Sequence, residues 1–252
     1  MRLTDTDFAS ALRISDYGDA GLLLLSDHDY SESVWQHFQA LAFAVEMASL
    51  PGCLEVIPAY DSLLILLDYR LTDPDSTRLA LTRLVSQESP TRIARRSRTF
   101  RVPVLFDLDA GPDLAHVAGE LELTADEVIK RTTSSKFTVR CLAGPLGHPL
   151  FDAPEFPREV RRLTVPRTAV PVGSLAVAGR QSSVYTVGSP GGWPLIGRTP
   201  VRFFDLGAIP PVPYRAGDQF EFFSIADGAW DTYAATQLEV IDTPAGPVER
   251  LR

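Results

Sequence analysis

The chain has 252 residues, of which 45% are hydrophobic and 22% charged, and this length suffices for two modest domains that each bury a core. Its formal net charge of −8 at pH 7 argues against a general affinity for nucleic acid or for an anionic membrane, because both bind positively charged surfaces. Small molecules and proteins remain as the expected classes of partner.

The N-terminal stretch, MRLTDTDFAS, carries acids where a secretion signal needs a basic region before an apolar one. The longest apolar runs, such as 63–67, are far shorter than a membrane span. Cys53 and Cys141 are the only cysteines, and their spacing is unlike that of a metal site. We therefore expect a cytoplasmic protein that binds neither a membrane nor a metal.

Residues 1–88 are expected to form a small α+β domain. A run of leucines at 22–25, after a turn, is typical of a buried strand. Apolar residues then recur at steps of three and four over 31–50, which predicts a helix capped by Ser31. A Pro-Gly pair ends this helix, two short strands follow, and 74–87 has the pattern of a second helix.

Residues 89–100 form the expected linker between two domains. The arginines in and beside this segment are Arg92, Arg95, Arg96, Arg98 and Arg101. A solvated connection between domains explains such a run, and contact with an anion or a partner protein is the alternative.

Residues 101–252 are expected to form a second domain that is mainly β. It begins with a strand, RVPVLFD, and an amphipathic helix whose apolar face comprises Leu114, Val117, Ala118 and Leu121. A further helix begins at Thr124, which pairs with Glu127 in a capping-box pattern. The strands that follow are FTVRCLAG, SLAVAG, SSVYTV, RFFDL and QFEFFSI. The predicted fold class is α+β, with a β-barrel or β-sandwich in the second domain.

Several common catalytic sites are absent from the sequence. It has no GxxxxGK[ST] phosphate loop, no GxSxG nucleophile elbow and no HExxH zinc motif. We therefore do not expect this chain to hydrolyse ATP by itself. No residue stands out as a catalytic nucleophile.

The glycine- and proline-rich segment that contains SPGGWPLIGRTP is the candidate site. Its prolines fix the backbone, and its glycines let the chain approach a ligand or a neighbouring strand closely. The backbone N–H groups of Gly191 and Gly192 are suited to hold an oxyanion. Arg167 or Arg198 would add a charged donor, and Trp193 an apolar wall. A β-rich scaffold that needs Gly and Pro at its corners and a tryptophan in its core explains the same residues.

The longer segment PRTAVPVGSLAVAGRQSSVYTVGSPGGWPLIGRTP resembles the C-terminal hallmark of the family of 5-oxoprolinase B-type subunits, which includes KipI-type kinase inhibitors and allophanate hydrolase subunit 1. YGDAGLLLL, PGCLEVIPAYDSLLILLD and VPVLFDLDAGPDLAHVAGELELTADEVI resemble earlier segments of that family in the same order. The likeness covers nearly the whole chain. Its most specific parts are SPGGWPLIGRTP and VPVGS.

The resemblance implies that 101–252 form a cyclophilin-like β-barrel domain with a substrate-binding cleft. The residues that match the cleft are Arg167, Ser174, Gln181, Gly191, Gly192, Trp193, Arg198 and Thr199. Two parts depart from the family. Arg131 stands where the family has a histidine, and 143–151 keeps only Gly147 in register and offers His148 in place of an aromatic residue. Either the ligand has changed or the site has lost its catalytic use.

The resemblance also implies a B-type subunit that pairs with a homologous C-type subunit and acts with a separate, ATP-using A-type subunit. Such a complex opens the ring of 5-oxoproline or cleaves a related cyclic or ureido amide, and ATP is used by the complex and not held by this chain alone. This chain would supply binding and electrostatics. The alternatives are a non-enzymatic KipI-type inhibitor of a sensor histidine kinase and a repurposed small-molecule-binding protein.

Overall fold

The computed structural model of the protein describes residues 3–19, 21–86, 94–95, 97–234, 236–242 and 248–249. The chain divides into two compact units, residues 1–96 with 245–252 and residues 97–244. Half of the expected linker, 89–100, lies outside the described residues, so the domain boundaries stay a prediction. The α+β class and the barrel domain are confirmed.

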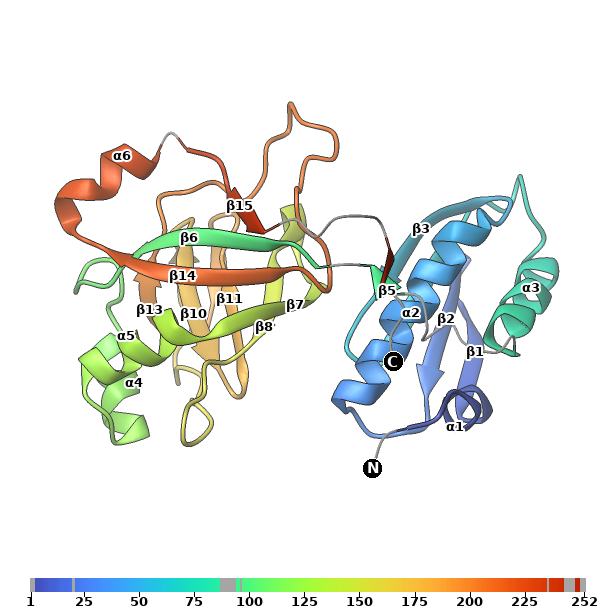
Figure 1. The fold of residues 1–252 in the computed structure, drawn as a ribbon, viewed down its shortest axis with the longest axis horizontal. Helices are drawn as coiled ribbons and strands as arrows, with labels where there is room; N and C mark the ends of the chain where they lie inside the picture. Colours follow the sequence, from blue (N-terminus) through green and yellow to red (C-terminus); the bar gives the residue numbers. More distant parts are fainter. Residues whose placement is uncertain are drawn as a thin grey trace. The chain divides into compact units, whose positions relative to one another are not determined.

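The N-terminal unit is built on a four-stranded antiparallel sheet. In their order across the sheet the strands are β1 (Leu12–Tyr17), β2 (Gly21–Ser26), β4 (Ser62–Leu67) and β3 (Cys53–Pro58). The helices of this unit are α1 (Asp5–Ser10), α2 (Glu32–Ala48) and α3 (Pro74–Ser86). A two-residue pairing joins β5 (Ala94–Arg95) to β16 (Val248–Glu249). Figure 1 shows α2 lying across one face of the sheet.

One face of this sheet is buried, because every second residue of β2 and β4 points into the core and the residues between them are more exposed. Leu22 and Leu24 of β2 are fully buried and pack in one core with Phe38 of α2. The helices predicted at 31–50 and 74–87 are confirmed as α2 and α3. No helix in the described part of the chain combines the length and the apolar character needed to cross a membrane.

The C-terminal unit contains a closed seven-stranded barrel. In chain order its strands are β6 (Thr99–Leu105), β7 (Lys136–Leu142), β8 (Pro149–Asp152), β10 (Ser174–Ala178), β11 (Gln181–Val184), β13 (Leu195–Arg198) and β14 (Gln219–Ile225). Around the barrel the order is β13, β10, β11, β8, β7, β14 and β6, and a pairing of β13 with β6 closes it. An eighth strand, β15 (Glu239–Asp242), pairs with the start of β6.

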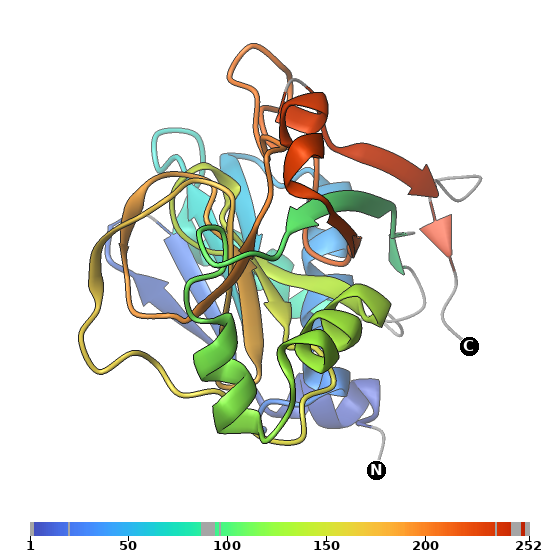
Figure 2. The same ribbon diagram turned by 90° about the vertical axis from the view of Figure 1, so that its left-hand side faces the viewer.

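Phenylalanines fill the interior of this barrel. Phe100, Phe137 and Phe220 are each at most 1% exposed, and the rings of Phe100 and Phe220 stack with centroids 5.1 Å apart. Helices α4 (Leu114–Leu121) and α5 (Ala125–Ser134) add residues to the same core. In Figures 1 and 2 these two helices lie on one side of the barrel strands, and the short helix α6 (Trp230–Ala234) lies on the other.

Both helix predictions in this unit are confirmed. The predicted apolar face of α4 is buried: Leu114, Val117, Ala118 and Leu121. The capping box at the start of α5 is present, with the Thr124 hydroxyl accepting from the Glu127 N–H at 3.2 Å and the Glu127 carboxylate accepting from the Thr124 N–H at 2.7 Å.

The strand predicted at RFFDL, 202–206, is wrong. Asp205 lies in a turn here, because its side chain accepts from the Gly207 N–H at 2.8 Å and its carbonyl accepts from the Ala208 N–H at 3.1 Å. Phe203 nevertheless enters the barrel core, where it is 3% exposed. Local turn chemistry thus overrides the alternation of apolar residues.

Candidate functional site

The SPGGW stretch belongs to a two-stranded ribbon that is separate from the barrel sheet. The ribbon pairs β9 (Arg167–Val170) with β12 (Ser189–Gly191), and Arg167 lies opposite Gly191. Strand β10 begins with Ser174, and the carbonyl of Ser174 accepts from the N–H of Tyr185 at 3.0 Å. Five predicted site residues therefore gather around Tyr185: Arg167, Ser174, Gly191, Gly192 and Trp193.

Tyr185 is the centre of a small apolar cluster outside the main barrel core. Its side chain packs with Val170, Ala176 and Leu195, and Trp193 packs against the same group. Gly191 covers the end of the tyrosine ring, because a Cβ atom at this position would lie 2.1 Å from the Tyr185 hydroxyl oxygen. The glycine is therefore required by this close approach and not by its backbone conformation.

Arg167 is held in place by Asp113, at the N-terminus of α4. Arg167 Nη2 lies 2.8 Å from Asp113 Oδ1, and the other carboxylate oxygen of Asp113 accepts from the Leu195 N–H at 2.8 Å. Arg167 Nη1 is buried and, among the described residues, has no hydrogen-bond partner. One side of the guanidinium is thus fixed by the protein while the other keeps its hydrogen-bonding capacity.

Ser174 is a second residue with an unused polar atom. It is 1% exposed, and its hydroxyl has no hydrogen-bond partner within the described part of the chain. Buried polar atoms are usually hydrogen-bonded, so an orphan hydroxyl next to Tyr185 is consistent with a ligand or water site.

Gly192 and Trp193 directly follow the ribbon strand β12. The carbonyl of Gly192 accepts from the Leu163 N–H at 2.7 Å. The guanidinium carbon of Arg162 lies 5.8 Å from the centroid of the Trp193 ring. The charge of this exposed arginine is therefore close to the Tyr185 cluster.

Arg198 and Thr199 make mainly structural contacts. Arg198 Nε donates to the carbonyl of Val172 at 2.8 Å, and its guanidinium carbon lies 5.3 Å from the centroid of the Trp230 ring. The Thr199 hydroxyl accepts from the Val201 N–H at 3.2 Å, and Thr199 is 2% exposed. Both residues adjoin Ser174 along the barrel, since Ser174 pairs with Arg198.

Gln181 lies away from the other predicted residues. It pairs with Ala178 at the turn of the β10–β11 hairpin, whereas Ser174 and Tyr185 lie at the far end of that hairpin. The structure does not bring Gln181 to the cluster.

The segment 143–151, which departs from the family pattern, reaches the same tyrosine. The rings of His148 and Tyr185 meet edge to face with centroids 5.0 Å apart. Burial lowers the pKa of His148, so its ring is neutral at pH 7. Arg131, the other departure, donates instead from Nη1 to the carbonyl of Glu155 at 2.6 Å, in a different part of the unit.

The charge state of Tyr185 makes it a hydrogen-bond donor at neutral pH. Burial raises the pKa of its hydroxyl, and the nearby charges of Arg162 and Arg167 oppose that rise. Its hydroxyl has no hydrogen-bond partner among the described residues. Within the same described residues, His, Cys, Asp and Glu side chains form no group that could hold a metal ion.

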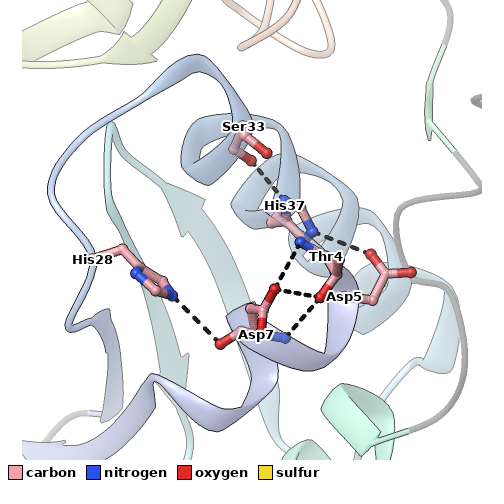
Figure 3. Close-up of polar contacts among 6 residues, drawn as sticks. All are labelled: Thr4, Asp5, Asp7, His28, Ser33 and His37. Carbon is pink, nitrogen blue, oxygen red and sulfur yellow. Dashed lines mark hydrogen bonds and ion pairs between the residues drawn. The ribbon is translucent and has the colours of Figure 1, made fainter. Parts of the chain in front are cut away.

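A polar cluster in the N-terminal unit, shown in Figure 3, has a structural role. His37 Nδ1 lies 2.6 Å from the carbonyl of Ser33, and Nε2 lies 3.1 Å from Asp5 Oδ1. His37 therefore ties α1 to α2, and its two ring nitrogens are both committed to protein contacts.

The chain matches a known protein family over most of its length. Residues 12–214 match the family model described as carboxyltransferase domain, subdomain C and D. The B subunit of 5-oxoprolinase from Bacillus subtilis is 30% identical over 230 residues, which cover 88% of this chain and 96% of that protein. The chain belongs to the 5-oxoprolinase B-subunit family. A further member, the B subunit of 5-oxoprolinase from Escherichia coli O157:H7, is 31% identical over 73% of this chain and 84% of its own length.

Solved structures share this fold. The protein TTHA0988 is 32% identical with a TM-score of 0.69; the match covers 82% of this chain and 40% of that one. PH0987 from Pyrococcus horikoshii is 31% identical with a TM-score of 0.50 over 86% of this chain and 100% of its own. The urea amidolyase of Kluyveromyces lactis shares the fold at 21% identity, with a TM-score of 0.72 over 91% of this chain and 16% of that one.

Two residues of the site were missed by sequence reasoning. Asp113 precedes a helix far from the motif in sequence, and no local pattern links it to Arg167. Tyr185 lies inside the SSVYTV segment, which alternation alone assigns to a strand. The Gly-Gly pair could have indicated a close neighbour such as Tyr185, since a tight approach to a neighbouring group is one reason for a glycine in a strand.

Proposed function

We propose that this protein is the B-type subunit of an ATP-dependent amidohydrolase complex that opens the ring of 5-oxoproline or of a related cyclic or ureido amide. The names of three curated relatives support a subunit of this kind, and the chain covers 96%, 84% and 88% of their lengths. These names favour the hydrolase subunit over the kinase inhibitor.

The chemistry requires activation of an unreactive amide. Ring opening of 5-oxoproline adds water across the lactam C–N bond: the hydroxyl goes to the carbonyl carbon and the proton to the ring nitrogen. Cleavage of ATP to ADP and phosphate drives this step when the carbonyl oxygen is phosphorylated first. Donors that face the substrate then stabilise the charge that develops.

The observation that carries this proposal is the buried, unpartnered Nη1 of Arg167 beside Tyr185 and Trp193, which has no hydrogen-bond partner among the described residues. A charged donor that is desolvated and fixed by a carboxylate is suited to bind an anionic or carbonyl-bearing ligand. No side chain of the Tyr185 cluster is a strong nucleophile at neutral pH, because Tyr185 is protonated there. This chain therefore contributes binding and electrostatics while other subunits supply the nucleotide site.

The subunit names of the relatives support partner chains, and the missing phosphate loop supports a separate ATP-using component. We propose a homologous C-type subunit as the direct partner and an A-type subunit as the ATP-using component. Co-expression of this chain with a C-type subunit from the same organism, followed by size exclusion, tests the first contact. A single peak with both chains is expected, and separate elution at micromolar concentration would count against the proposal.

A further inference from the structure

We propose that Arg167 and Tyr185 form a two-point site for a carboxylate of the ligand, and that Asp113 is the positioning residue for Arg167. This inference rests on the proposed function, and it names the part of the cyclic amide that the chain recognises. The ligand class is a small ring amide that carries a carboxylate.

Both donors belong to residues that adjoin Gly191. Gly191 is the strand partner of Arg167, and its missing Cβ would lie 2.1 Å from the Tyr185 hydroxyl oxygen. Arg167 Nη1 and the Tyr185 hydroxyl both lack a hydrogen-bond partner within the described residues. Two unused donors beside the same glycine, both largely shielded from water, have hydrogen-bonding capacity that a ligand can satisfy.

Asp113 gives the arginine a defined orientation. It is 9% exposed, and its two oxygens bind different groups, Arg167 Nη2 at 2.8 Å and the Leu195 N–H at 2.8 Å. A backbone N–H of strand β13 therefore holds the same carboxylate that contacts the guanidinium. An arginine held in this way loses little conformational entropy when a ligand binds to its free side.

The balance of charge at the cluster favours an anion. Arg162 and Arg167 bring two positive charges close enough to Tyr185 to oppose the rise that burial causes in its pKa. Asp113 supplies one negative charge, and the neutral ring of His148 adds no charge. A carboxylate has two oxygens, so it can accept from Arg167 and from the Tyr185 hydroxyl together. A neutral lactam carbonyl would leave the positive charge uncompensated, which is why we assign the carboxylate to this pair.

The test compares two probes that differ in this one group, 5-oxoproline and 2-pyrrolidinone, which is the same lactam without the carboxylate. Calorimetry of the full chain should show weaker binding of 5-oxoproline by at least about tenfold in Arg167→Gln and in Tyr185→Phe. Binding of 2-pyrrolidinone should be unchanged in both variants. Arg180→Gln is the control, because Arg180 is an exposed arginine of the same unit whose side chain pairs with Glu159.

Asp113→Asn separates positioning from general stability. A residue that only stabilises the fold would weaken both probes alike, whereas a positioning residue lowers the ratio of 5-oxoproline to 2-pyrrolidinone affinity. We expect this ratio to fall about tenfold, with a thermal melt that still shows a folded protein.

Three results would overturn the inference: equal losses for both probes in the Arg167 and Tyr185 variants, no loss for 5-oxoproline, or binding of neither probe by the wild-type chain. The proposed function is judged separately by assembly with the C-type subunit and by ring opening in the complex. A complex that assembles and turns over while the Arg167 and Tyr185 variants bind normally would refute the carboxylate site and leave the function standing.

Discussion

Two arginines of the motif have different surroundings, although the sequence gives no reason to separate them. Arg167 is fixed by a carboxylate and keeps a buried nitrogen without a partner among the described residues, whereas Arg198 donates to a backbone carbonyl and lies against an aromatic ring. Their removal should therefore have different effects on folding and on binding.

Arg198→Ala is expected to lower the free energy of unfolding by about 1 kcal/mol, because one hydrogen bond to Val172 and the contact with Trp230 are lost. As a predicted site residue, Arg198 should also contribute roughly 1.5–3 kcal/mol to binding of an anionic ligand. Urea unfolding and calorimetry with 5-oxoproline measure the two effects. Equal ligand affinities in wild type and Arg198→Ala would remove Arg198 from the site.

Gly191→Ala is expected to destabilise the protein by about 1–3 kcal/mol, because the added Cβ would lie 2.1 Å from the Tyr185 hydroxyl oxygen. Gly192→Ala is the matched control, since its Cβ would make only an ordinary contact at 3.5 Å with Pro166. Tyr185→Phe in the Gly191→Ala background should recover part of the loss. Equal unfolding free energies for the two alanine variants would contradict the proposed close approach.

At the residue scale the sequence predicts which residues are unusual but not what they contact. The Gly-Gly pair and both arginines were found in the motif, yet Asp113 was missed because its partner lies in a strand that the chain reaches only after two helices and two barrel strands. Long-range pairing of this kind leaves no periodic signal in one sequence.

At the scale of elements, the helices were the easiest to predict. Helices α2, α3 and α4 repeat their apolar residues at helical spacing. Helix α5 begins with a capping box, which can be recognised from the four residues 124–127. Strands β9 and β12 were not separated from their surroundings, because a strand of three or four residues that contains proline and glycine shows no alternation. These short strands position the site.

The capping box of α5 gives a pH-dependent prediction. Hydrogen bonds from the backbone and hydroxyl of Thr124 lower the pKa of Glu127 from the usual 4.5, so the carboxylate contributes stability that is present above pH 4.5 and is lost as the pH falls through its folded pKa. Glu127→Gln keeps an acceptor that does not titrate. Its urea midpoint should therefore fall less than that of the wild type between pH 7 and acid.

The control for this prediction is Asp126→Asn, which removes a first-turn carboxylate that takes no part in the capping box. Its midpoint should follow the pH dependence of the wild type more closely than Glu127→Gln does. An identical slope for Glu127→Gln and wild type would show that the box adds nothing to the pH dependence.

At the scale of the molecule, the two units have separate cores, and damage to one should spare the other. Phe38→Ala removes a fully buried ring from the N-terminal core and should cost about 3–5 kcal/mol there. Hydrogen exchange should rise in α2, β2 and β4 but not in β6 or β14. Phe220→Ala in the barrel should give the reverse pattern, and faster exchange in both units of either variant would contradict independent cores.

The overall architecture was predictable in part from periodicity, since the change from helical to alternating patterns marks the barrel. Barrel closure was not, because it depends on the pairing of β13 with β6, which lie about ninety residues apart in the chain. The function came from the resemblance, and physical reasoning added which residues could bind a ligand. No sequence pattern identified the surface that meets a partner.

The most direct test of the central claim is ATP-dependent ring opening of 5-oxoproline, reconstituted from this chain and purified C-type and A-type subunits, with glutamate as the measured product. We expect turnover only when all three chains are present, none from this chain alone, and a marked loss when Arg167→Gln replaces the wild type. Equal turnover by the other two subunits without this chain, or turnover by this chain alone, would contradict the account.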